Sequence, residues 1–146
     1  MKSHSTIAAV LLTFTLLSSS CSAKDTVIPV NQLPEAARTF ISEKLSDYQI
    51  TYAAKDNDDY EIRLANSWEV EFNKSGEWTD IDCDRNAVPS DIVSLLPAAV
   101  TEYISASFQD SFITEIHKER KGFEIELDNG LNLEFNKAGQ FKRIDD

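Results

Sequence analysis

The chain has 146 residues, 42% of them apolar and 27% charged, and its formal net charge is −11. These fractions are those of a globular protein and argue against a disordered chain. The acidic balance argues against a nucleic-acid-binding protein, because phosphate binding needs clustered Lys and Arg. It is compatible with a basic partner or a divalent cation.

The first 23 residues have the pattern of a secretory signal peptide. Lys2 precedes a run of apolar residues and Thr from Ile7 to Leu17, and small residues follow it. The run is too short to span a membrane as a helix of the mature protein. We therefore expect an exported protein, located in the periplasm or on the outer membrane of a Gram-negative bacterium.

Two cleavage sites are compatible with this signal. The segment Leu17-Ser-Ser-Ser-Cys21 resembles a bacterial lipobox, in which Cys21 is lipidated and becomes the first residue. Its Leu lies one position further from the Cys than in the common pattern. The alternative is ordinary cleavage after Ala23. We favour the lipoprotein, which would meet the membrane only through its N-terminal lipid.

Most of the remaining chain is one sequence pattern that occurs twice. Residues 33–82 recur as residues 96–145 at a constant offset (96 − 33 = 63), and 20 of the 50 aligned pairs are identical. A long, regular period indicates a duplicated structural unit. The predicted units are residues 24–84 and 85–146. Because a unit of this size alone is only marginally able to bury a core, we expect the two to pack together or to share a sheet.

Each unit begins with a helix. Apolar residues from Leu33 to Leu45 recur at spacings of three and four and form one stripe, and the second copy extends from Leu96 to Phe108. Pro34 and its counterpart Pro97 fit the first helical turn, where the missing N–H costs nothing. Residues 24–32 are expected to be a polar lead-in, and residues 83–95 a linker between the units.

After each helix the hydrophobic period changes to two, which is typical of antiparallel strands with one buried and one solvated face. The predicted strands are 49–55, 60–64, 68–72 and 77–82, and then 112–118, 123–127, 131–135 and 140–145. Tight hairpin turns are expected at 66–67 and 129–130, and left-handed glycines at Gly76 and Gly139. The predicted fold class is α+β, with two tandem repeats that each pack one helix on a four-stranded antiparallel meander.

The last strand of the first unit departs from the period of two. Its apolar residues, Trp78 and Ile81, are three positions apart, which predicts a bulge or a strong local twist.

No motif in the sequence indicates catalysis, a cofactor or a dedicated metal site. Asp80, Asp82 and Asp84 alternate like the start of an EF-hand loop, but Arg85 replaces the glycine that such a loop needs. The glutamates of the predicted strands could act as acid and base only if one of them lay in an apolar pocket. They alternate with core residues, so we expect them to point to water. We therefore expect a protein that is not an enzyme.

Cys21 is either lipidated or removed with the signal, which leaves Cys83 as the only thiol of the folded part, so no intramolecular disulfide is expected. A nucleophilic cysteine would need a histidine partner, and the one histidine of the mature chain, His117, lies in the other unit. We expect Cys83 to be a half-buried structural residue at a strand end.

The outward side chains of the strands are the remaining candidate for function. If the two meanders lie side by side, these residues form a broad polar surface on which a protein partner could dock. The candidates on this surface are Glu61, Arg63, Glu69, Glu71, Glu124, Glu126, Asn132 and Glu134, and Thr51, Thr114 and Lys142 belong to the same outward set.

The tandem pattern Leu-Pro-x-Ala, Tyr/Phe-Glu-Ile-x-Leu and Glu-Phe-Asn-Lys-x-Gly-x-Trp/Phe resembles the PepSY-like family of beta-lactamase-inhibitor-like proteins. The resemblance extends over nearly all of residues 27–146 in two copies. It implies a fold like that of the beta-lactamase inhibitor protein and an exported protein. It carries over no catalytic residues. Because related PepSY domains accompany peptidases as inhibitory propeptides, it keeps peptidase regulation open.

The leading hypothesis is an exported, non-catalytic binding or inhibitory module whose polar sheet face meets an envelope protein. The alternative is an envelope sensor of a small ligand or calcium that uses the acidic sheet face. A hydrolase is the weakest of the three hypotheses.

Overall fold

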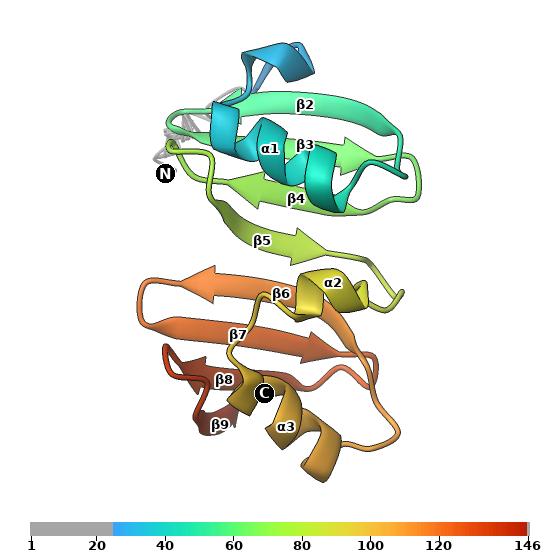
Figure 1. Cartoon of the computed structure of the whole chain (residues 1–146), viewed down its shortest axis with the longest axis vertical. Helices are drawn as coiled ribbons and strands as arrows, with labels where there is room; N and C mark the ends of the chain where they lie inside the picture. The colour runs from blue at the N-terminus through green and yellow to red at the C-terminus, as the bar shows by residue number, and fades with distance from the viewer. Residues whose placement is uncertain (1–24, 146) are drawn as a thin grey trace, which may run out of the picture.

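The computed structural model describes residues 25–145 and shows an α+β protein. Nine strands form one antiparallel sheet, and their order across the sheet is their order in the chain (Figure 1). The strands are β1 (Thr26–Val27), β2 (Ile50–Asp56), β3 (Asp59–Leu64), β4 (Glu69–Phe72), β5 (Trp78–Asp82), β6 (Ile113–Glu119), β7 (Gly122–Leu127), β8 (Asn132–Asn136) and β9 (Phe141–Asp145).

The helices lie together on one side of this sheet (Figure 1). They are α1 (Glu35–Lys44), the short α2 (Ser90–Val93) and α3 (Ala98–Ser107), preceded by a 3-10 turn, η1 (Val30–Gln32). Pro34 and Pro97 precede the first residues of α1 and α3, one position earlier than expected from the sequence. The expected lead-in and linker are thus more ordered than predicted, because they contain β1, η1 and α2.

The pairing of β5 with β6 joins the two halves of the chain into one sheet. Asp80, Ile81 and Asp82 lie opposite His117, Ile116 and Glu115, respectively. Of the two arrangements left open by the sequence, packed units or a shared sheet, the structure shows the shared sheet.

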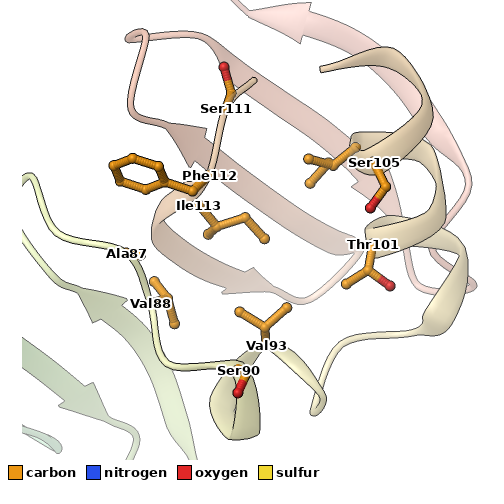
Figure 2. A pocket seen from close by; sticks show the side chains of 10 residues that line it. Ala87, Val88, Ser90, Val93, Thr101, Ser105, Ser111, Phe112 and Ile113 are labelled. Atoms are coloured by element: carbon orange, nitrogen blue, oxygen red, sulfur yellow. The ribbon is translucent and has the colours of Figure 1, made fainter. Parts of the chain in front are cut away.

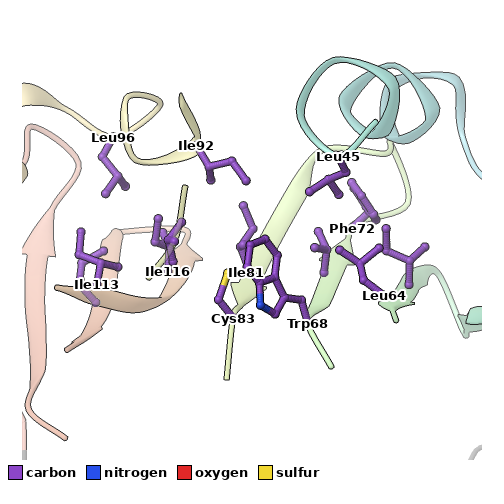
Figure 3. Close-up of a cluster of buried hydrophobic side chains, with 14 of the residues drawn as sticks. Leu45, Leu64, Trp68, Phe72, Ile81, Cys83, Ile92, Leu96, Ile113 and Ile116 are labelled. Atoms are coloured by element: carbon purple, nitrogen blue, oxygen red, sulfur yellow. The ribbon is translucent and has the colours of Figure 1, made fainter. Parts of the chain in front are cut away.

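An apolar row crosses the sheet beneath the helices and forms part of the base of the core. Successive strand pairs place its members directly opposite one another: Ala53, Ile62, Val70, Ile81, Ile116, Ile125 and Leu133. All seven side chains are buried, and they pack in one cluster with Ala37, Ile92 and Val100 from the helices. Figure 3 shows Ile81 and Ile116 of this row with Ile92 of α2. Burying an aliphatic side chain of this size contributes about 1.5–3 kcal/mol. The burial of this row explains why apolar and polar residues alternate strictly along the strands.

The predicted left-handed glycines are confirmed at Gly76 and Gly139, each with φ of 81°. The Gly76 N–H donates to the Asn73 carbonyl over 2.8 Å, as expected after a type I turn. A Cβ on Gly76 would lie 2.7 Å from the Cβ of Pro34. The turn after β4 therefore approaches the start of α1 so closely that only glycine fits.

The predicted irregularity of the last strand is also confirmed. The β4–β5 pairing shifts register between Glu71 and Phe72, so Thr79 is an extra residue. Two further bulges, absent from the sequence prediction, leave Thr51 in β2 and Thr114 in β6 without a partner in the strand register. Both hydroxyls then donate to a carbonyl of the neighbouring strand, Thr51 to Arg63 and Thr114 to Glu126.

Candidate binding face

The face of the sheet opposite the helices, here called the open face, is polar across the sheet from β3 to β9. Its side chains alternate with the buried row, and the strand register arranges them in two further rows. The first row is Glu61, Glu71, Asp80, His117, Glu124, Glu134 and Arg143. The second row is Arg63, Glu69, Asp82, Glu115, Glu126, Asn132 and Asp145.

All eight candidates from the sequence lie in these two rows, on β3, β4, β7 and β8. The structure adds Asp80, Asp82, Glu115 and His117 from β5 and β6, which sequence reasoning missed. The signal was present, because these residues also alternate with buried isoleucines. It was overlooked because the two aspartates were considered only as part of a calcium loop.

Thr114 was expected on the polar surface, and this expectation was wrong. Its side chain is 2% exposed, whereas the equivalent Thr51 is exposed. Both residues occupy bulges, but β6 lies in the middle of the sheet, where the Cys83 N–H donates to the Thr114 carbonyl over 2.9 Å. The difference in exposure therefore follows from the position of each strand in the sheet.

Cations of the open face are confined to its two ends. On β3, Arg63 Nε lies 3.3 Å from Glu69 Oε2, and its guanidinium lies 4.9 Å from the centre of the Tyr52 ring. At the other end, Lys142 and Arg143 both pair with Glu134, at 3.0 and 2.6 Å. Arg63 thus pairs with Glu61 and Glu69, and Lys142 and Arg143 pair with Glu134.

The middle of the open face, formed by β4 to β7, carries carboxylates almost without cations. The two rows place here Glu69, Glu71, Asp80, Asp82, Glu115, Glu124 and Glu126, with His117 as the one basic side chain among them. We call these eight residues the acidic seam. His117 Nδ1 lies 2.7 Å from Asp80 Oδ2, so this pair bridges β5 and β6.

The crowding of the acidic seam perturbs the pKa values of its members. Burial, reinforced by the charges of Asp80 and Asp82, raises the pKa of Glu115 to about 8. Burial also raises the pKa of Asp80, although the hydrogen bond with His117 acts in the opposite direction. For His117, burial lowers the pKa but the bond and charge of Asp80 outweigh it, so the net pKa is raised. Ionisation of Asp80 and Glu115 is therefore less favourable in the folded protein than in water.

The structure does not group the titratable side chains as a metal centre. Within residues 25–145, no three His, Cys, Asp or Glu side chains are placed so that they could hold a metal ion together. Asp80 and Asp82 belong to strand β5, and Asp84 lies in the turn after it, where its N–H donates to Asp82 Oδ1 over 2.7 Å. This segment is a strand end and not a coordinating loop.

Cys83 is fully buried and not half-buried as expected. Burial, together with the charge of Asp82, raises the pKa of its thiol to about 12. A thiol with this pKa is protonated at neutral pH and is a poor nucleophile. Cys83 packs among Trp68 and Ile81 in the core (Figure 3).

Two of the hollows in the described part of the chain differ in their linings. One, of about 240 Å³, lies between α2, α3 and the start of β6 and is lined by apolar and hydroxyl side chains, among them Val93, Ile104 and Phe112 (Figure 2). The other, also of about 240 Å³, lies near the β1 end of the open face. Five carboxylates contribute to its lining: Asp25, Asp56, Asp59, Glu61 and Glu71.

Comparison with known proteins identifies close structural relatives. A "putative periplasmic protein of unknown function" from Bacteroides vulgatus is 36% identical, with a TM-score of 0.78, over 84% of this chain and 100% of its own. A "putative calcium-regulated periplasmic protein" from Bacteroides thetaiotaomicron is 32% identical, with a TM-score of 0.77, over 84% and 97%. A second B. vulgatus "putative periplasmic protein" is 30% identical, with a TM-score of 0.78, over 86% and 99%.

No curated protein matches the chain. Among the described residues, no helix has the length and apolar character needed to cross a membrane. The family described as "Putative beta-lactamase-inhibitor-like, PepSY-like" matches residues 19–70 and again residues 58–143. The resemblance seen in the sequence is thereby confirmed, and the chain belongs to the PepSY-like, beta-lactamase-inhibitor-like family.

Proposed function

We propose that this protein is an exported, non-catalytic binding or inhibitory module that presents its open face to a protein partner in the cell envelope, such as a peptidase or another envelope enzyme. The observation that carries the proposal is the one-sided architecture. All described helices cover one face of a nine-stranded sheet, and the other face is left polar and uncovered (Figure 1). A continuous rigid sheet holds many side chains in a pre-organised array, which reduces the ordering cost of binding.

The absence of catalysis is part of this proposal, and the chemistry of the candidate groups supports it. The Cys83 thiol is buried and protonated. The hollow beside α3 has no acid, base or thiol in its lining. An acid–base pair needs neighbouring groups whose environments separate their pKa values within a pocket that excludes water, whereas the acidic seam lies on an uncovered sheet.

We further infer that the protein is a tandem of two units, residues 24–84 and 85–146. Equivalent features recur in both: the bulges at Thr51 and Thr114, and the glycine turns at Gly76 and Gly139. The family matches two stretches of the chain, which supports duplication. In this view β1 and β5 take equivalent positions, each beside the first long strand of a unit. Val27 of β1 pairs with Ala54 of β2, and Asp80 of β5 pairs with His117 of β6, which is the residue equivalent to Ala54.

Export and lipidation concern residues 1–23, which lie outside the described residues. Export is supported by the three similar proteins, all described as periplasmic. We propose lipidation at Cys21 on the basis of the sequence. Mass spectrometry of the mature N-terminus tests it: a diacylglyceryl cysteine at position 21 is expected, and an unmodified N-terminus after Ala23 would contradict it.

Site-specific crosslinking tests the proposed partner. A photoreactive residue at position 124 on the open face should crosslink to a discrete envelope protein in cells, whereas one at position 43 on the outer side of α1 should not. Charge reversal at Glu69, Glu71 and Glu134 should abolish the product. If no product forms from the open face, or if both positions give the same products, the proposed function is wrong.

A second candidate function is a calcium sensor. Two observations favour it: five carboxylates line the hollow near β1, and one relative at 32% identity is described as a "putative calcium-regulated" protein. Calcium prefers six to eight oxygen ligands, which carboxylates and water can supply. A thermal-shift titration should then show stabilisation by millimolar calcium that is lost in Asp56→Asn/Asp59→Asn; no shift in the wild-type protein would remove this candidate.

A further inference from the structure

We propose that the partner of the open face is a polypeptide segment rich in Lys and Arg, which lies on the acidic seam of β4 to β7 and runs parallel to these strands. The inference rests on the proposed function and specifies the chemistry of the partner. Its basis is the register of the sheet, which places like charges directly opposite one another where folding stability alone would favour opposite charges.

The strand pairing sets six pairs of carboxylates face to face on neighbouring strands. They are Glu61 with Glu71, Glu71 with Asp80, Glu69 with Asp82, Asp82 with Glu115, Glu115 with Glu126, and Glu124 with Glu134. Directly opposite like charges destabilise an antiparallel pair by a few tenths to about 1 kcal/mol. Glu115, whose pKa is about 8, keeps its proton at neutral pH, so the four pairs without Glu115 carry this repulsion. A surface that exists only to be solvated could carry mixed charges at no such cost.

The chain contains cations that could relieve this repulsion, but the fold places them elsewhere. Arg63, Lys142 and Arg143 neutralise carboxylates at the two ends of the open face. Lys118 of β6 points to the helix side and lies 5.1 Å from the centre of the Trp78 ring. The seam is therefore complementary to positive charge supplied from outside, which would both steer association and relieve the internal repulsion.

The geometry of the seam suits several separate cations better than one metal ion. Neighbouring strands are about 4.8 Å apart, and alternate residues of one strand are about 6.6–6.8 Å apart. Calcium requires its oxygens at about 2.3–2.6 Å from a single point. Outward side chains on a sheet are roughly parallel and do not converge, and no metal-holding group of three occurs among the described residues. Nucleic acid and anionic lipid surfaces would be repelled.

An extended polypeptide that runs parallel to the strands matches the spacing along them. Alternate side chains of an extended segment point to the same side and are also about 6.6–6.8 Å apart. Lys or Arg at alternate positions would therefore reach the first and second rows together, for example Asp80 and Asp82 on β5. The expected ligand has basic residues at every second position and small polar residues between them.

Fluorescence anisotropy with the mature chain tests this inference. The probe is a labelled twelve-residue peptide of alternating Lys and Ser, and the control peptide has acetyl-lysine in place of Lys. The acidic seam variant is Asp82→Asn/Glu126→Gln, which removes one carboxylate from β5 and one from β7 while retaining oxygen acceptors for the Asp84 N–H. The matched variant is Glu43→Gln/Glu102→Gln, which removes two exposed charges from α1 and α3.

Binding of the Lys peptide should weaken about tenfold or more in the seam variant and about twofold or less in the matched variant, and it should decrease with salt. Thermal melts of both variants establish that each is folded. Equal weakening in the two variants, or binding of the acetylated peptide with the same affinity, would overturn the inference. The crosslinking experiment decides the proposed function separately, because it detects a partner of any chemistry.

Discussion

Replacing Glu115 by Gln should stabilise the protein at high pH and change little at low pH. Glu115 lies on β6 between Asp82 of β5 and Glu126 of β7, and burial with these neighbouring charges raises its pKa from an ordinary value of 4.5 to about 8. Between these two values the folded protein retains a proton that the unfolded chain has released. The free energy of unfolding therefore falls as the pH rises from 4.5 through 8.

The magnitude follows from the size of the shift. A difference of 3.5 pKa units corresponds to about 5 kcal/mol at about 1.4 kcal/mol per unit, which is an upper bound. Asp80 and Asp82 share the repulsion, and solvent screens a side chain that is only half-buried, so a net effect of about 1–2 kcal/mol is expected. Gln at this position is neutral at every pH and cannot acquire the unfavourable charge.

The assay is urea denaturation of wild type and Glu115→Gln at pH 5 and pH 9, followed by tryptophan fluorescence. Trp68 is 6% exposed in the folded protein, so its emission should change on unfolding. The stability difference between variant and wild type should grow by about 1–2 kcal/mol from pH 5 to pH 9. Glu102→Gln on α3 should show no such growth. A pH-independent difference, or a variant less stable than wild type at pH 9, would refute the reasoning.

Three further predictions concern the fold. Gly76→Ala should destabilise the protein by about 2 kcal/mol or more in urea denaturation, because the new Cβ would lie 2.8 Å from the backbone of α1. Gly130→Ala should cost about 1 kcal/mol, because Gly130 has the same φ of 81° but open space around it. Ile116→Ala, at a fully buried position, should cost about 2–5 kcal/mol, and Ile144→Ala, at 44% exposure, less than about 1 kcal/mol; equal costs would contradict the buried row. The Cys83 thiol should resist iodoacetamide in the folded protein and react in urea, and rapid labelling without denaturant would contradict its burial.

Much of the local structure followed from the sequence because its signals are local. The change of period from 3.6 to 2, the Asn and Gly residues of the turns and the apolar spacing of Trp78 and Ile81 each depend on residues close together in the chain. They predicted the main helices, the eight longer strands, the turns and a bulge. The alternation also separated the buried row from the outward residues, and so placed eight candidates on the open face.

The arrangement of the open face could not be obtained in this way. Thr51 and Thr114 occupy equivalent positions and each follows an isoleucine, yet one is exposed and the other is buried, because only β6 has a long neighbour on each side. Likewise, Asp80 and His117 form an ion pair at 2.7 Å only because β5 joins β6. Nothing in the spacing of either residue indicates this contact.

The sequence by itself determined which side chains point outward and how acidic they are as a set. Only the tertiary structure decided that these carboxylates stand opposite one another in a continuous seam and that the cations lie at its ends. The physical reason is that strand register is set by hydrogen bonds and packing between segments far apart in the chain, such as those that carry Asp82 and Glu115. Periodicity specifies the face of a strand, and pairing specifies the neighbours across it.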